Sequence, residues 1–263
     1  MSQILIPLDG SELANKALAI GDALAQSSNS SILLLTAGWG STVEELETML
    51  RAKSDQLRAA SSFKVIPDTF PASAIVEELK TADDVLVMST HGRSGVGRAL
   101  LGSVAEEVLN RTGMPVVLVG PHTEVDSFAG GTLGIAIDAT ATSALVLAPA
   151  AQLAKQLDLN VEVITATTAS GVPFGETDAD AVANAVSAAL AFLQQEGINA
   201  TAKSCTGGTA DEAICDYVNA AGLSFLAMTS HSRSGMARTV LGSTTIHVVR
   251  NAKCPVIVVR PKV

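Results

Sequence analysis

The chain has 263 residues, of which 48% are hydrophobic and only 3% aromatic, and its formal net charge is −9. This length suits two domains of ordinary size, and the acidic balance argues against general binding to nucleic acid or to an anionic membrane surface. A local phosphate site remains compatible with that charge, because backbone amides and helix termini bind anions without basic side chains.

Apolar segments at residues 3–8, 32–36, 63–70, 85–88 and 114–119 are predicted to be the strands of the first half. Apolar residues at helical spacing predict helices between them, one beginning near Glu12 and others at 44–60, 72–81 and 104–111, the last stopped by Gly113. This alternation predicts a parallel sheet with helices on both faces, in which ligands bind past the carboxyl ends of the strands.

Residues 88–103, MSTHGRSGVGRALLGS, place a glycine-rich loop between a strand and a helix N-terminus. Backbone N–H groups point outward in such a loop, and the absence of Cβ atoms lets a phosphate approach closely. The stretch returns at residues 228–243, and eight of thirteen positions are identical between 91–103 and 231–243. The chain is therefore predicted to be one α/β unit used twice.

The repeat also predicts the domain boundaries. Residues 133–137 repeat the first strand, so that Asp138 matches Asp9, and residues 254–259 repeat 114–119. We expect a first domain at 1–122, a linker at 123–131 and a second domain at 132–263, with about 11 extra residues near 171–180 before a helix at 181–195. The two halves are expected to pair through their fifth strands, because bare apolar edges invite aggregation.

The three cysteines, Cys205, Cys215 and Cys254, lie among apolar neighbours without CxxC spacing, which predicts buried free thiols. The first residues form a strand pattern rather than a leader, and no apolar run reaches the ~18 residues of a membrane span. A reducing, cytoplasmic location is expected from these features.

These motifs resemble the universal stress protein family, most of all its nucleotide-binding members with two domains in tandem. The family pattern Gly-x2-Gly-x9-Gly-Ser/Thr falls here on Ser89, Gly92, Gly102 and Ser103, and the family aspartate that ends the first strand falls on Asp9. The resemblance covers nearly the whole chain. It implies two tandem Rossmann-like domains of the adenine nucleotide alpha hydrolase-like type, each a five-stranded parallel sheet with helices on both faces.

The resemblance implies that ATP, ADP or AMP binds in the first domain together with Mg²⁺, and that Asp9 meets the ribose or the metal. The residues expected to bind this nucleotide are Leu8, Asp9, Ala37, Ser89, His91, Gly92, Arg93, Gly95, Gly102, Ser103 and Val104. A second, weaker site is expected at Asp138, Ser232, Gly235, Gly242 and Ser243. It is weaker because Ser232 stands where the first half has Gly92.

Each of these residues also has a purely structural interpretation. Asp9 could cap a turn, the loop glycines could serve only φ > 0 geometry, and Ser103 could be a plain helix N-cap. His91 could simply pack in the loop, and Arg93 and its repeat at 233 could make salt bridges between the domains.

Three functions follow from the motifs. The first is a regulatory module that binds an adenine nucleotide in the stress response, with an unidentified protein partner and at most slow hydrolysis. The second is a structural interaction protein, an intrachain pseudo-dimer with empty clefts, and the third is a nucleotide hydrolase. The sequence has neither a P-loop nor a recognisable pairing of nucleophile and base, so no catalytic residue is expected. A homodimer of such chains is left open.

Overall fold

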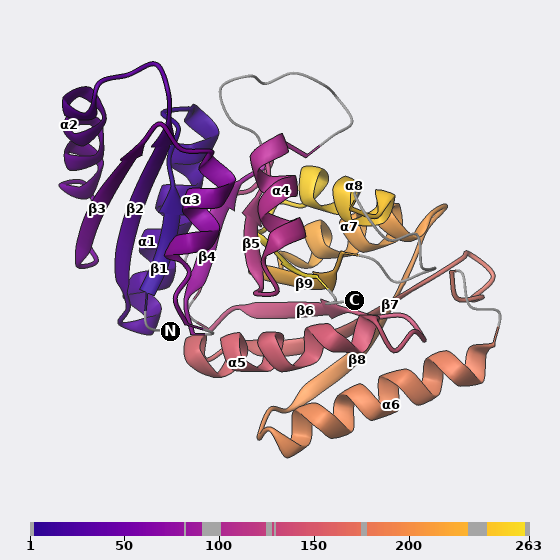
Figure 1. Cartoon of the computed structure of the whole chain (residues 1–263). Helices are drawn as coiled ribbons and strands as arrows, with labels where there is room; N and C mark the ends of the chain where they lie inside the picture. The colour runs from indigo at the N-terminus through magenta and orange to yellow at the C-terminus, as the bar shows by residue number, and fades with distance from the viewer. Residues whose placement is uncertain are drawn as a thin grey trace.

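The computed structural model describes residues 3–81, 83–90, 101–124, 128, 130–174, 178–230 and 241–260. Within these ranges the strands join into a ten-stranded sheet in the order β3-β2-β1-β4-β5-β10-β9-β6-β7-β8, with helices on both faces (Figure 1). The predicted fold class is confirmed, because each half contributes five parallel strands.

The strands and α-helices follow the same order in both halves. Those of the first half are β1 Gln3–Pro7, α1 Glu12–Ser28, β2 Ser31–Gly38, α2 Val43–Ser54, β3 Ser61–Pro67, α3 Pro71–Glu78, β4 Val85–Ser89, α4 Ser103–Arg111 and β5 Val116–Val119. Those of the second half are β6 Thr132–Ala136, the 3-10 helix η1 Ser143–Val146, α5 Leu147–Leu157, β7 Asn160–Thr167, α6 Ala179–Gln195, β8 Ala200–Thr206, α7 Ala210–Ala221, β9 Phe225–Thr229, α8 Ser243–Asn251 and β10 Val256–Val259.

The two halves meet edge to edge at the middle of the sheet. β5 and β10 are the one antiparallel pair among the described strands, with Ile257 opposite Val117. The expectation that the fifth strands pair is confirmed. Both strands begin two residues later than predicted, after Pro115 and Pro255, since proline has no N–H for a sheet hydrogen bond.

Alternating side chains divide the core into two layers. On β1, Ile4 and Ile6 join the layer under α1, α2, α5 and α6, whereas Leu5 joins the layer under α3, α4, α7 and α8. Both layers run through both halves, and Figure 1 shows α3 beside α4 and α8 beside α7 on the same face. Cys205, Cys215 and Cys254 are buried and free in this core, as predicted.

Helix α2 ends six residues before its predicted end. The Asp22 carboxylate on α1 accepts hydrogen bonds from the backbone N–H groups of Arg58 and Ala59, at 3.1 and 3.0 Å. These tertiary bonds replace the helical ones that the apolar spacing suggested, so the chain turns toward β3 instead. Helix α3 likewise stops at Glu78, short of the predicted residue 81.

Two further predicted boundaries are wrong for local reasons. β3 stops at Pro67 rather than at residue 70, because Asp68 adopts left-handed geometry with φ of 52°. Helix α4 ends at Arg111 with Thr112 as an extended cap, so Gly113 is not its left-handed stop signal.

The second half departs from the first after β6. The 3-10 helix η1 precedes α5, because Pro149 lies in the first turn of α5 and its ring prevents a regular helix from extending further back. The insertion predicted near 171–180 folds back on β7: Pro173 bridges Thr167, and the Phe174 N–H donates to the Ala166 carbonyl at 3.1 Å. The described part of the chain has no helix long and apolar enough to cross a bilayer.

Candidate functional site

The first half contains a cleft of about 300 Å³ at the carboxyl ends of β1 and β4. β1 has β2 on one side and β4 on the other, so the strand order reverses there, which is where ligands bind in open α/β sheets. All seven described members of the predicted first site line this cleft: Leu8, Asp9, Ala37, Ser89, Gly102, Ser103 and Val104. The other four, His91, Gly92, Arg93 and Gly95, lie outside the described residues.

The two ends of the glycine-rich segment are held together at the cleft. The Thr90 N–H donates to the Val119 carbonyl at 3.1 Å, and the Gly102 N–H donates to the Thr90 carbonyl at 2.7 Å. The first bond joins the end of β4 to the end of β5, and the second joins the end of β4 to the start of α4, so both ends of the glycine-rich segment lie at the cleft wall.

The N-terminus of α4 opens onto this cleft. Its N-cap is Gly102, which has no side chain to cap the helix, and Ser103 is the first helical residue. The alternative that Ser103 is an N-cap is therefore wrong by one residue. With no capping side chain, the N–H groups of the first turn, at Ser103 and Val104, keep their capacity to bind an acceptor, and the helix dipole favours an anion there.

Asp9 forms the turn that follows β1. Its Oδ1 accepts a hydrogen bond from the Ser11 N–H at 2.9 Å, and Gly10 supplies the left-handed residue with φ of 83°. Ser11 in turn caps α1, since its hydroxyl accepts from the Ala14 N–H at 3.2 Å. The turn interpretation of Asp9 is confirmed. The Asp9 carboxylate is half-buried and lies on the cleft wall, where it is the only acidic side chain among the described lining residues.

A second cleft, of about 380 Å³, occupies the matching place in the second half. Asp138, Gly242 and Ser243 of the predicted second site line it, whereas Ser232 and Gly235 lie outside the described residues. Asp138 is held as Asp9 is: its Oδ1 accepts from the backbone N–H of Thr140 at 2.9 Å and also from its hydroxyl.

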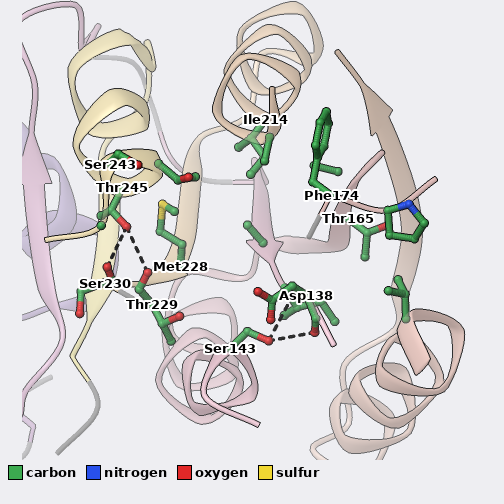
Figure 2. Close-up of a pocket in the computed structure, with 18 residues that line it drawn as sticks. Asp138, Ser143, Thr165, Phe174, Ile214, Met228, Thr229, Ser230, Ser243 and Thr245 are labelled. Atoms are coloured by element: carbon green, nitrogen blue, oxygen red, sulfur yellow. Dashed lines mark hydrogen bonds between the residues drawn. The ribbon is translucent and has the colours of Figure 1, made fainter. Parts of the chain in front are cut away.

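Hydroxyl groups fix the walls of the second cleft. The Thr245 hydroxyl donates to the carbonyls of Thr229 and Ser230, at 3.2 and 3.3 Å, and the Ser143 hydroxyl donates to the Asp138 carbonyl at 3.0 Å (Figure 2). The first cleft has Ala105 where the second has Thr245. The second cleft is therefore lined by a more extensive hydroxyl network than sequence analysis anticipated.

The sequence analysis also missed an aromatic wall of the second cleft. Figure 2 shows Phe174 on the side of the pocket opposite Thr229 and Ser230, next to Thr165 and beside Ile214. Phe174 lies in the inserted segment. The only feature of the sequence that could have indicated this wall was therefore the presence of extra residues in the second half. The apolar wall of the first cleft, made by Pro71 and Ile75 on α3 and by Met88 near the end of β4, was missed as well.

Each cleft has one carboxylate among its described lining residues, Asp9 in the first and Asp138 in the second. No cluster of three or more potential metal-ligating side chains occurs in the parts of the chain that the structure describes. A divalent cation at Asp9 would therefore need most of its oxygen ligands from a bound phosphate and from water, which is how Mg²⁺ is commonly held. The buried thiols are protonated at neutral pH, because desolvation raises the pKa of Cys205 to about 11 and that of Cys254 to about 12.

Known proteins match the chain along nearly its whole length. A model of the universal stress protein family matches twice, at residues 1–120 and 131–260. A universal stress protein of Methanocaldococcus jannaschii is 51% identical over 51 residues, which are 19% of this chain and 29% of that protein. The chain thus aligns with under a third of that curated relative.

Two solved structures share the fold across both halves. A universal stress protein from Archaeoglobus fulgidus has a TM-score of 0.70 at 21% identity, with 98% of each chain covered. A putative universal stress protein from Pseudomonas aeruginosa has a TM-score of 0.66 at 17% identity, covering 99% of this chain and 94% of that one. With the fold repeated in both halves and the family model matching each, the chain belongs to the universal stress protein family as a tandem member.

Proposed function

We propose that the protein is a regulatory module that binds an adenine nucleotide with Mg²⁺ in its first domain. One observation carries the proposal: the residues that the family motif assigns to the nucleotide, wherever the structure describes them, line a single cleft at the switch point in the first half of the sheet. At about 300 Å³ the described part of this cleft is at the lower end of the range for small-molecule sites.

The walls of the cleft suit the parts of a nucleotide. Leu8, Ala37 and Met88 offer apolar surface to a base, whereas Asp9 offers carboxylate oxygens that accept from ribose hydroxyls or bind Mg²⁺. The α4 N-terminus, at Gly102 and Ser103, offers N–H groups to phosphate oxygens. The metal, when bound, would neutralise phosphate charge.

The output of such a module is conformational or acts through a protein partner. The described lining residues of the first cleft include no histidine, lysine or cysteine to serve as a base or nucleophile. The domain boundaries at 122 and 132 belong to this proposal, which assigns one tight site to the first domain and at most a weak one to the second.

The competing function is a structural interaction protein without a bound nucleotide. The antiparallel pairing of β5 and β10 favours it, because this pairing makes the chain an intrachain pseudo-dimer with or without ligand. Ultraviolet absorbance of the supernatant after heat extraction of the purified protein separates the two functions directly, since a co-purified nucleotide would appear there.

An isosteric substitution tests the nucleotide site. Asp9→Asn keeps an Oδ1 acceptor for the Ser11 N–H, so the turn and the melting temperature should survive, whereas the negative charge is lost. In calorimetric titrations we expect ATP with Mg²⁺ to bind about tenfold or more weakly to this variant, because a charge-assisted contact contributes about 1.5–3 kcal/mol. Without Mg²⁺ the difference should shrink.

The matched control is Asp138→Asn, which makes the same change at the equivalent turn of the second half. It should leave the affinity of the tight site as it is in the parent protein. Absence of any ATP binding by the parent protein, together with a nucleotide-free extract, would decide for the structural alternative.

A further inference from the structure

Two large aromatic side chains stand in solvent beside the first cleft. Trp39 is 56% exposed and Phe70 is 68% exposed, and their rings form an edge-to-face pair with centroids 4.9 Å apart and planes at 77°. The whole chain has only one tryptophan, one tyrosine and six phenylalanines. Burial in the core does not explain why two of these few rings are placed together on the surface.

Helix stability does not explain Phe70 either. It is the N-cap of α3 and makes no side-chain cap hydrogen bond. At the same place in the second half, the N-cap of α7 is Thr209, whose hydroxyl accepts from the Glu212 N–H in a complete capping box. A phenylalanine side chain cannot accept a hydrogen bond from the first N–H groups of a helix. The first half therefore lacks this stabilising bond and has an exposed ring at the N-cap instead.

Both rings belong to residues that adjoin the lining of the first cleft in the chain. Ala37 and Pro71 line the cleft, Trp39 follows Ala37 by two residues, and Phe70 directly precedes Pro71. Two residues of extended chain span about 7 Å, so the backbone of Trp39 lies within about that distance of Ala37. β2 and β3 hold the two loops side by side, because Gly38 pairs with Pro67.

The second half has an aromatic ring at the same end of its own cleft. Ala166 matches Ala37 in the repeat. Its carbonyl accepts a hydrogen bond from the N–H of Phe174, whose ring lines the pocket (Figure 2). That ring comes from the insertion, whereas the first half uses Trp39 and Phe70. Two different chain segments thus bring aromatic surface to the same end of the two clefts.

We propose that Trp39 and Phe70 form a stacking platform for the planar base of the ligand in the first cleft, a purine-type base in particular. The inference rests on the proposed function and deepens it: the base lies at the Ala37 end, and the phosphates lie at the α4 end. An edge-to-face pair with both rings more than half exposed leaves ring faces open for stacking. The platform makes affinity depend on a flat aromatic base as well as on phosphate.

The fluorescence of Trp39 can report on ligand binding directly, because Trp39 is the single tryptophan of the chain. Fluorescence excited selectively at tryptophan is measured in the full chain while ATP with Mg²⁺ is added, and again with inorganic tripolyphosphate with Mg²⁺. We expect ATP to change the emission of Trp39 saturably, with the affinity that calorimetry gives, and tripolyphosphate to leave it unchanged.

Phe70→Thr is the informative variant, since it copies the N-cap of α7. We expect its melting temperature to equal or exceed that of the parent, because a cap is gained, while ATP binds about tenfold more weakly by calorimetry. The matched control is Leu145→Thr, which removes an apolar side chain of similar exposure, 51%, from the second half. It should change neither the emission response nor the ATP affinity.

The outcomes separate the two proposals. No calorimetric binding of ATP to the parent would overturn the proposed function and the platform together. ATP binding that Phe70→Thr leaves unchanged, or an equal response of Trp39 to tripolyphosphate, would overturn the platform alone. A shift in oligomeric state of Phe70→Thr on size-exclusion chromatography, with ATP affinity unchanged, would assign the rings to a contact between copies and also overturn it.

Discussion

Replacing Gly120 with alanine tests how the two halves pack. Gly120 follows β5 and is buried against α8 of the other half. A Cβ at this position would lie 2.0 Å from the carbonyl oxygen of Val249 and 3.2 Å from its carbonyl carbon. These are backbone atoms of a helix whose Val248 and Val249 side chains are at most 1% exposed, so they cannot swing aside.

The expected cost follows from two opposed effects. Glycine to alanine by itself restricts the unfolded chain and stabilises the folded state by about 0.4–1 kcal/mol. Overpacking of a buried site costs about 1–3 kcal/mol, and a contact this short belongs at the upper end or beyond. We therefore expect Gly120→Ala to lower the free energy of unfolding by about 2 kcal/mol and the melting temperature by about 4–8 °C.

Differential scanning calorimetry measures this shift, and Gly208→Ala is the matched control. At Gly208 the nearest atom to an added Cβ is the Glu212 carboxylate oxygen at 2.9 Å, which belongs to the capping box of α7 but ends an exposed side chain that can shift. The control should shift the melting temperature by at most about 2 °C. A Gly120→Ala protein that melts with the parent would refute the close approach of β5 and α8, and with it the described packing of the halves.

Two further results are expected. Burial raises the pKa of Cys205 from 9.0 to about 11 and those of Cys215 and Cys254 from 9.0 to about 12, so only the unfolded chain loses these protons just above pH 9. The free energy of unfolding, measured in urea, should therefore be highest below pH 9 and fall as the pH rises toward 11–12. The fall should be less steep in Cys254→Ala, and equal slopes would contradict the assignment to thiols. Equilibrium dialysis at micromolar ATP should find one nucleotide per chain, since Ser232 stands where the first half has Gly92 and a Cβ there opposes left-handed geometry; two equal sites would contradict this.

Much of the fold could be predicted because the strands are short apolar runs at regular intervals and the pattern occurs twice. A strand such as β4, whose middle residues are all buried, has no alternative in a chain that alternates strands with amphipathic helices. The same topology put Asp9 and Ser89 at the carboxyl ends of neighbouring strands, so the place of the first cleft was predictable, although its wall from α3 was not.

What could not be predicted depends on contacts between distant residues. The early end of α2 is set by Asp22, 36 residues before the amide that it binds at Arg58. The aromatic wall of the second cleft depends on how the insertion folds back, through the bond from the Phe174 N–H to Ala166. Local spacing carries no signal for either contact, because an apolar period fixes which face of an element is buried and not what lies against it.

A repeated glycine motif has a structural explanation as well as a functional one. The Gly242 N–H donates to the Ser230 carbonyl as the Gly102 N–H donates to Thr90, and a Cβ on Gly242 would lie only 3.0 Å from that carbonyl oxygen. The close approach of strand end and helix start therefore favours glycine in the second half whether or not a phosphate binds there. Residues that the fold does not need are stronger indicators of a ligand. Phe70, which neither caps its helix nor enters the core, is such a residue, and it lies beside the first cleft.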